Sequence, residues 1–560
     1  MRSLTAKSTC ALTTAAALWL LAVASPLSAQ EVTAAINGTV TDTSGAAISG
    51  AKVTATDLDR DTAFPTLTAA DGSYELPRLP IGRYDVRVEN PGFQSMVKSN
   101  ITLVLNQTAQ INFQLQVGNV NQTVNVTEAP PLLETESTEV GTVIGSHAIV
   151  SLPLETRNYN QLALLTPGAV TTSPASFNTG QATFNSGRPY INGNREQATY
   201  YLLDGMENIE FVDNNVAFSP NVDAIQEFNL ITNNPSAEFG QFMGGVISVS
   251  MKSGTNQFHG DLFEFIRNDK LNANEWSNNF TNLPRPLLRW NEFGGTFGGP
   301  VVRNKLFFFV DYQGSRFDTP PSPTTITTFS KLEQSQPGNF SDVPGIALVY
   351  PGTTTPIPGN NLNNANKCGS AQQMQLNATA AAPCVFISPL ALKLLAAFPS
   401  ASMAGSNNGT LNNAINVQHV YTNGDQGDAK IDWAPTDKDH VFGRYSQQYV
   451  TQPTTNSQAL LYNSSGNNIF PLYQGVLDWT HTFGPTFVNE ARTGVNYFPA
   501  EGNVQGATST NFASIIPGEP TAFLPGMYFA GAPVGGSQNG PFAFGTVSAP
   551  EIFHQTSIQA

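Results

Sequence analysis

The sequence predicts a mainly β protein built from several units. Its 560 residues are too many for one ordinary domain. Charged residues make up only 12% of the chain, about half of the usual share in soluble domains, whereas glycine and proline are abundant. Short runs that alternate apolar and polar residues recur between clusters of turn residues. A soluble multi-domain β-protein fits this composition as well as a membrane barrel does.

The first unit is an export signal that covers residues 1–29. Arg2 and Lys7 precede the apolar run ALTTAAALWLLAVA, and small residues allow cleavage near Ala29, with Ala24 as a rival site. An uncleaved anchor is the alternative interpretation. No later run reaches about 18 unbroken apolar residues, so any membrane crossing must use a closed barrel.

Charge and cysteine content narrow the expected partners and compartment. Acidic residues outnumber basic ones by 41 to 26, which gives a net charge of -15 and argues against nucleic acid as a partner. Cys10 leaves with the signal. Cys368 and Cys384 remain, and in an exported protein they are expected to form one disulfide, with two free thiols as the alternative.

Residues 31–118 predict a small β-sandwich of about seven short strands. Asp71-Gly72 is a tight-turn signal, and the run YDVRVENPGF alternates apolar and charged residues. The unit resembles the carboxypeptidase regulatory-like domain, which implies a carbohydrate-binding-like fold and no peptidase activity. The matching motifs are Gly38-Thr39-Val40-Thr41-Asp42, Gly50-Ala51-Lys52-Val53, Asp71-Gly72-Ser73-Tyr74 and Leu79-Pro80-Ile81-Gly82-Arg83-Tyr84.

Residues 119–150 read as an extended linker because they combine a proline pair with an acidic run and few aromatics. A β-prone segment near its start has the composition of a strand that adds to the edge of a partner's sheet. A plain linker is the alternative. The candidate coupling segment consists of Gln122, Thr123, Val124, Asn125, Val126, Thr127 and Glu128.

Residues 151–257 predict a compact α+β unit. Leu162 and Leu165 lie near a helical spacing that ends at Pro167-Gly168. Asn192-Gly193 is a strong turn signal between two expected strands, and another strand ends at Asp204-Gly205. Asp204 is interpreted as a turn residue with no ligand role.

This α+β unit resembles the plug domain of TonB-dependent outer-membrane receptors. Together with the preceding sandwich, the runs RNYNQLALLTPG and GGTFGGPV resemble the Oar-like branch of that superfamily. The matching residues are Ile191-Asn192-Gly193, Leu203-Asp204-Gly205-Met206, Ile225-Gln226-Glu227-Phe228, Glu238-Phe239-Gly240, Gly244-Gly245-Val246-Ile247 and Ser253-Gly254-Thr255-Asn256.

Residues 258–560 contain long runs in which one face is apolar and the other polar. Leu477, Trp479 and Phe483, for example, oppose Asp478 and Thr480. A soluble sandwich also alternates, but aromatic residues near strand ends favour a membrane wall. With the plug resemblance, the expected fold is the N-terminal part of an antiparallel transmembrane β-barrel. We count roughly six to nine wall strands where the family has about 22, so the chain is expected to be incomplete.

The resemblance implies a TonB-dependent-type receptor in the cell outer membrane that takes up a nutrient ligand such as a glycan or peptide fragment. Its expected partners are a TonB-like energy-coupling protein, outer-membrane lipid and an extracellular small ligand. An adhesion or assembly protein on the same scaffold is the alternative. No nucleophile motif, phosphate loop or metal-ligand spacing stands out, so neither an enzyme nor a cofactor is expected.

Overall fold

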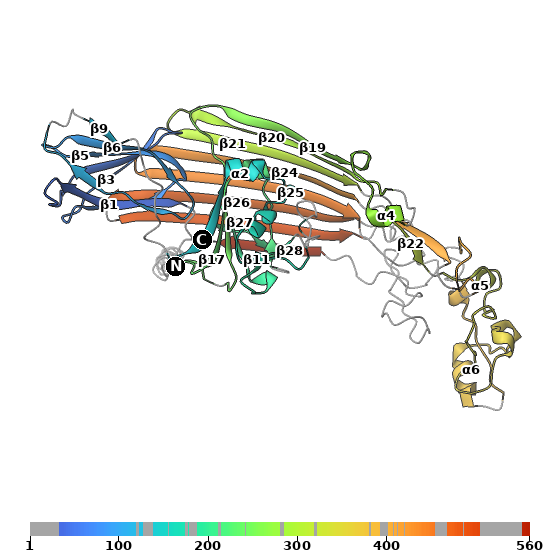
Figure 1. Cartoon of the computed structure of the whole chain (residues 1–560). Coiled ribbons are helices and arrows are strands. Elements are labelled where there is room, and N and C mark those ends of the chain that lie inside the picture. The colour runs from blue at the N-terminus through green and yellow to red at the C-terminus, as the bar shows by residue number, and fades with distance from the viewer. Residues whose placement is uncertain are drawn as a thin grey trace, which may run out of the picture.

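The computed structural model describes most of the chain in ranges separated by short gaps (Figure 1). These ranges are 33–118, 123–126, 138–154, 156–173, 177, 187–210, 214–240, 242–280, 285–318, 322–326, 328–379, 382–392, 401–406, 408–410, 413–418, 421–453, 467–484, 487–503 and 552–559. The proposed signal 1–29 lies outside them. No helix in the described part of the chain is both long and apolar enough to cross a membrane.

The N-terminal sandwich (residues 33–118 together with 123–126) has two packed sheets, as the sequence predicts. One sheet has the order β4-β1-β7 with β8 also on β1, and the other has the order β3-β2-β5-β6-β9. Tyr84, Val86 and Val88 alternate with charged residues along β5 and are fully buried between the sheets. The strands are β1 (Ala34–Asp42), β2 (Lys52–Asp57), β3 (Thr62–Leu67), β4 (Ser73–Leu79), β5 (Gly82–Glu89), β6 (Ser95–Leu103), β7 (Thr108–Gln110), β8 (Phe113–Leu115) and β9 (Thr123–Val126).

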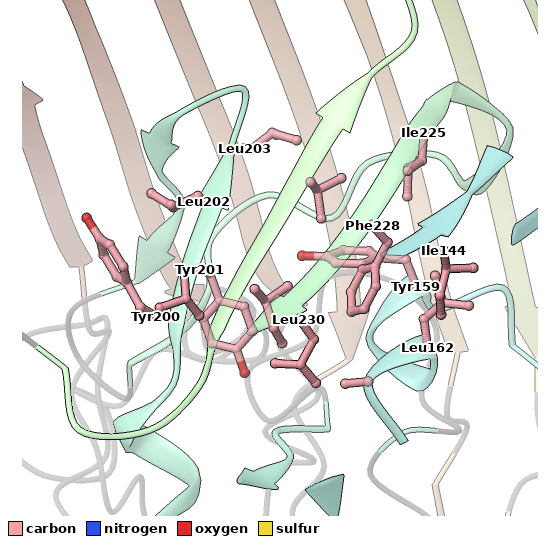
Figure 2. Close-up of a cluster of buried hydrophobic side chains, with 14 of the residues drawn as sticks. Ile144, Tyr159, Leu162, Tyr200, Tyr201, Leu202, Leu203, Ile225, Phe228 and Leu230 are labelled. Atoms are coloured by element: carbon pink, nitrogen blue, oxygen red, sulfur yellow. The ribbon is translucent and has the colours of Figure 1, made fainter. Parts of the chain in front are cut away.

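The middle unit (residues 138–257) is built on a five-stranded sheet with the order β10-β17-β18-β13-β14. Short helices cover this sheet, and Tyr159, Leu162, Phe228 and Leu230 belong to its buried apolar core (Figure 2). Its strands are β10 (Val140–Gly145), β11 (Ala169–Val170), β12 (Tyr190–Ile191), β13 (Tyr200–Leu203), β14 (Met206–Glu207), β15 (Ile209–Glu210), β16 (Asn215–Val216), β17 (Ile225–Asn233) and β18 (Val246–Met251). Its helices are α2 (Ser146–Ser151), η1 (Tyr159–Leu165), η2 (Glu196–Ala198) and η3 (Val222–Ala224).

Two local predictions in the middle unit hold only in part. The run with helical spacing forms the 3₁₀ helix η1, in which Leu162 is buried but Leu165, the last residue of the helix, is exposed. Asn192-Gly193 does form a turn with positive φ at both residues. It does not join a hairpin, because β12 pairs with β11 and β13 pairs with β18.

The wall sheet is an antiparallel sheet of eight strands in the order β19-β20-β21-β24-β25-β26-β27-β28, which matches the expected count. Its strands lie side by side in Figure 1. They are β19 (His259–Asn268), β20 (Arg289–Val302), β21 (Leu306–Asp318), β24 (Tyr421–Thr436), β25 (Asp439–Pro453), β26 (Asn467–Gly484), β27 (Phe487–Asn503) and β28 (Ile552–Gln559).

Most wall strands are longer than the expected length of about 9–11 residues. β20, β21 and β24 to β27 contain 13 to 18 residues. In β24 part of the additional length is polar: the run 422–425 follows Tyr421 and continues the ladder with β21. The paired wall strands are therefore longer than the apolar band that a bilayer requires.

The two faces of the wall sheet are inverted relative to a soluble sheet. The face toward the middle unit buries polar residues, and the opposite face exposes apolar ones, as the alternation predicts. The buried polar residues include Gln426, Asp428, Lys430, Arg444, Ser446, Gln474 and Asn496, and the exposed apolar residues include Ile431, Trp433, Tyr445, Leu477, Trp479, Val495 and Tyr497.

β19 departs from this pattern. We expected one lipid face and one inner face, but Leu262, Phe265 and Ile266 are exposed on both sides of the strand. The reason is its place at the edge of the eight-stranded sheet, where only β20 pairs with it among the described strands. β18, which precedes it, is buried at every position.

A loop unit (residues 328–418) extends from one end of the wall sheet on the ribbon formed by β22 (Ser322–Ile326) and β23 (Ala414–Gln418). It lies at the end opposite to the N-terminal sandwich (Figure 1). Its helices are α5 (Lys331–Ser335), η5 (Pro358–Asn360), η6 (Leu362–Asn364), α6 (Ala371–Leu376) and η7 (Asn377–Thr379). A shorter connection after β19 holds η4 (Asp269–Leu271) and α4 (Trp276–Phe280).

Candidate functional site: the contact between the middle unit and the wall

A buried charge cluster joins the middle unit to the wall sheet. Asp204 lies in the turn between β13 and β14, with positive φ, and points toward β24 and β25. Its carboxylate lies 2.8 Å from Nε of Arg444 and accepts a hydrogen bond of 3.2 Å from Nζ of Lys430. The Arg444 contact is an ion pair without hydrogen-bond alignment. Asp428 lies 3.6 Å from the same guanidinium, so the cluster carries two acids and two bases.

The cluster compensates the cost of burying Asp204. Burial alone would raise the pKa of Asp204, but Lys430, Arg444 and the N–H of Met251 outweigh it and hold the pKa below its ordinary value. The Met251 N–H donates to the carboxylate at 3.0 Å. Asp204 therefore carries a charge that is stable only while the wall bases remain beside it.

A second cluster surrounds Arg157 in the RNYNQ motif. Its guanidinium pairs with Asp223 of the middle unit and lies 3.5 Å from the Glu292 carboxylate on β20. The same guanidinium lies 4.8 Å from the ring centre of Phe263 and 4.1 Å from that of Phe265, both on β19. One arginine thus holds the middle unit to two neighbouring wall strands.

The Ser253-Gly254-Thr255-Asn256 motif lies where the sandwich, the middle unit and the wall meet. A Cβ at Gly254 would lie 2.4 Å from the backbone oxygen of Phe308 and 2.6 Å from that of Gly299, so only glycine fits. Asn256 donates to the Arg60 carbonyl of the sandwich at 2.7 Å and to Asn304 of the wall at 2.7 Å. The motif is therefore a structural junction between the three units.

The N-terminal sandwich also contacts both other units. Arg78 forms an ion pair with Glu490 on β27, and Phe64 stacks on His440 of β25 with ring centres 4.5 Å apart. The N–H of Leu105 donates at 2.7 Å to Glu227 on β17. Burial raises the pKa of Glu227 to about 7, although this hydrogen bond favours the charged form.

A cavity of about 320 Å³ remains where these three units meet. Charged side chains from all of them line it, among them Arg60, Lys252, Lys430 and Arg492. Within the described residues, no group of histidine, cysteine and acidic side chains could hold a metal ion. The cavity is thus lined by both charged and apolar side chains from all three units.

The structure places the predicted site residues far from this contact. Thr123–Val126 of the coupling segment form β9 on the sandwich, while Gln122, Thr127 and Glu128 lie outside the described residues. Cys368 and Cys384 are joined by a disulfide in the loop unit, with Cα atoms 5.4 Å apart. The charge clusters were missed by sequence reasoning, which gave Asp204 only a turn role.

One signal in the sequence does point to these clusters. Lys430 and Arg444 occupy inward positions of strands whose outward neighbours are apolar. A charged residue that faces the inside of a wall needs a partner there, which either a neighbouring wall strand or the middle unit can supply. Which acid supplies it depends on the fold.

Two families match the chain. The family described as "Outer membrane beta barrel domain" matches residues 250–560, which is more than half of the chain. The family described as "Carboxypeptidase regulatory-like domain" matches residues 35–116. The second match coincides with the N-terminal sandwich described above.

Known transporters are similar to the chain over part of their length. The TonB-dependent transporter Oar of Myxococcus xanthus is 30% identical over 281 residues, which cover 47% of this chain and 25% of Oar. The outer membrane transporter YddB of Escherichia coli is 12% identical, with a TM-score of 0.39 over 64% of this chain and 39% of YddB. The siderophore receptor PirA of Acinetobacter baumannii is 12% identical, with a TM-score of 0.35 over 65% of this chain and 42% of PirA.

The chain thus spans about a quarter of the length of the curated relative that it matches. Its inverted wall sheet agrees with the matched barrel family, whose members lie in the cell outer membrane. The chain therefore belongs to the outer membrane β-barrel family, as a homologue of the TonB-dependent transporter Oar with a carboxypeptidase regulatory-like domain at its N-terminal side.

Proposed function

We propose that this protein takes up a nutrient ligand through the outer membrane with energy supplied by a TonB-like coupling protein. The observation that carries the proposal is the middle unit, which acts as a plug: it covers the polar face of the wall and is held there by buried ion pairs. Asp204 with Lys430 and Arg444, and Arg157 with Glu292, are the main links.

These links explain why an energy source is required. Each joins side chains that are almost fully buried, and separating them removes at least one buried charge from its partner. Breaking one buried pair costs about 3–5 kcal/mol, so two pairs hold the middle unit against thermal opening. A ligand on the outer side cannot pass the wall unless a force shifts this unit.

The coupling segment 122–128 is the point at which that force acts on the chain. It lies between the sandwich and the middle unit in the chain, so a pull on it reaches the middle unit through residues 129–137. A TonB-like protein would pair with it by adding a strand to a sheet edge. The export signal 1–29 would deliver the chain to the envelope.

The ligand is proposed to be a glycan or a peptide fragment, bound on the outer loops. The loop unit extends beyond the wall, and the disulfide between Cys368 and Cys384 closes a short loop within it. The carbohydrate-binding-like fold of the N-terminal sandwich supports a glycan. It does so only by resemblance, because the sandwich lies at the opposite end of the wall.

The test is growth on defined nutrients. A strain without the gene is compared with the parent on single glycans and peptides, and growth on at least one of them should be lost. The intact gene should restore growth, whereas a gene lacking residues 122–128 should not. A gene lacking residues 130–136 shortens the same linker without touching the segment and should restore growth.

The adhesion alternative predicts a different outcome. An outer-membrane adhesin needs no coupling segment, so the variant without residues 122–128 would behave like the intact protein in surface attachment. Full growth of the deletion strain on every nutrient, together with loss of attachment, would favour adhesion over uptake.

A further inference from the structure

The coupling segment is part of the N-terminal sandwich. β9 pairs with β6 in parallel, in the register Ser95 with Thr123, Met96 with Val124, Val97 with Asn125 and Lys98 with Val126. It is the last strand in the order β3-β2-β5-β6-β9. The segment that a coupling protein should bind is thus held by backbone hydrogen bonds to another unit of the same chain.

An edge strand leaves half of its backbone groups for another strand. In any β-strand, successive residues direct their N–H and C=O groups to opposite edges. The ladder with β6 uses one edge of β9, and no strand among the described residues pairs with the other edge. Such an edge is a template for strand addition.

The position of this edge suits a partner from the periplasmic side. β9 lies at the end of the sandwich that projects beyond the wall strands, opposite to the loop unit (Figure 1). The loop unit would face the outside of the cell, so β9 faces the side from which an energy-coupling protein approaches. Among the described strands, none of the wall or of the middle unit pairs with it.

We propose that the N-terminal sandwich is a docking platform: the coupling protein adds its strand to the free edge of β9 while β9 stays paired with β6. The partner would extend the five-stranded sheet by one strand. This inference rests on the proposed function, because it assumes that the segment 122–128 is the coupling segment.

The platform has a thermodynamic advantage over a free linker. A disordered segment loses conformational entropy when it pairs with a partner, whereas β9 is already extended when the partner arrives. The platform is also tied to the rest of the protein through Leu105 and Glu227 and through Arg78 and Glu490. A bound partner therefore holds a sandwich that touches both the middle unit and the wall.

The test is a covalent staple between β6 and β9. Val97→Cys with Asn125→Cys joins two register partners, whose Cα atoms lie about 4.8 Å apart in paired strands, within reach of a disulfide. The full chain carries Cys368→Ala and Cys384→Ala so that only the new pair is redox-active. Lys98→Cys with Thr123→Cys is the control, because these positions are out of register by three residues.

Binding of the purified periplasmic domain of the host's TonB-like protein is measured on oxidised and reduced protein in detergent. We expect the register pair to form a disulfide, the control pair to form none, and oxidation to change the Kd by less than about threefold, since the free edge is untouched. A loss of about tenfold or more on oxidation, recovered on reduction, would show that β9 must leave the sheet. Failure of the register pair to cross-link would also overturn the platform.

Proline substitutions separate this inference from the proposed function. Thr123→Pro and Val124→Pro each remove one backbone N–H, and these adjacent donors, both outside the staple, face opposite edges of β9. On the stapled protein, only the proline on the free edge should weaken binding, by about tenfold for the lost pairing. If neither stapled nor unstapled wild-type sequence binds the domain, the proposed coupling role itself fails.

Discussion

Replacing Asp204 should loosen the middle unit from the wall. Asp204→Asn keeps the shape of the side chain and removes the charge that faces Lys430 and Arg444. Both bases are buried, with side chains 8% and 0% exposed, so water cannot replace the lost partner. The variant therefore leaves two buried cations, of which only Arg444 keeps an ion-pair contact, with Asp428, among the described residues.

The expected magnitude follows from what remains in the cluster. Removing one partner of a buried pair costs about 3–5 kcal/mol. Arg444 keeps its 3.6 Å contact with Asp428, and Lys430 keeps the Met251 carbonyl at 3.3 Å, so the lower end applies. A loss of about 3 kcal/mol corresponds to about a 150-fold rise in the opening equilibrium.

Hydrogen exchange of the full chain in detergent measures this opening directly. Peptides that cover β13 and β18 should exchange about 100-fold faster in Asp204→Asn than in the wild type, because exchange follows the local opening free energy. The control is Asp425→Asn, which breaks the exposed pair with Arg316 and should cost about 0–1 kcal/mol. Equal effects of the two substitutions would refute the view that the buried cluster holds the middle unit.

Three further predictions concern other contacts. Burial raises the pKa of Glu227 from 4.5 to about 7, so between these pH values the folded chain binds more protons than the unfolded chain. The free energy of unfolding should therefore fall as the pH rises from 5 to 8, and it should fall less steeply in Glu227→Gln. Urea titration at each pH measures this. Gly254→Ala should lower the free energy of unfolding by about 1–3 kcal/mol in the same urea titration, because the new Cβ meets the backbone of the wall. Gly240→Ala, whose Cβ would enter open space, should lower it little. Equal urea midpoints for the two variants would contradict the role of Gly254 as a junction between units. Reducing the bond between Cys368 and Cys384 opens a loop of 16 residues and should destabilise the loop unit by about 3 kcal/mol, seen as faster proteolysis there with the wall unchanged.

The alternation of the wall strands could be predicted because it depends on local pattern alone. Leu477 and Trp479 face outward and Asp478 inward, as a period of two requires. The sandwich could be predicted for the same reason, since Asp71-Gly72 specifies a turn and the alternating run of β5 specifies which side chains face the core.

The charge clusters could not be predicted because their members lie far apart in the chain. Asp204 and Arg444 are separated by 240 positions, and a turn residue gives no sign of the base that it meets. The pairing of β9 with β6 was hidden for a similar reason: a strand-forming segment in a linker does not say which edge it joins. Exposure on both faces of β19 follows from its edge position, which pattern does not encode.

Lipid contact of the exposed tryptophans tests the central claim most directly. Single-tryptophan variants keep either Trp479, which is 43% exposed on the outer face, or Trp290, which is 4% exposed. In proteoliposomes whose acyl chains carry bromine near the headgroup end, the fluorescence of Trp479 should be strongly quenched and that of Trp290 should not. Quenching of Trp479 by aqueous acrylamide with no effect of the brominated lipid would contradict a wall that faces the membrane.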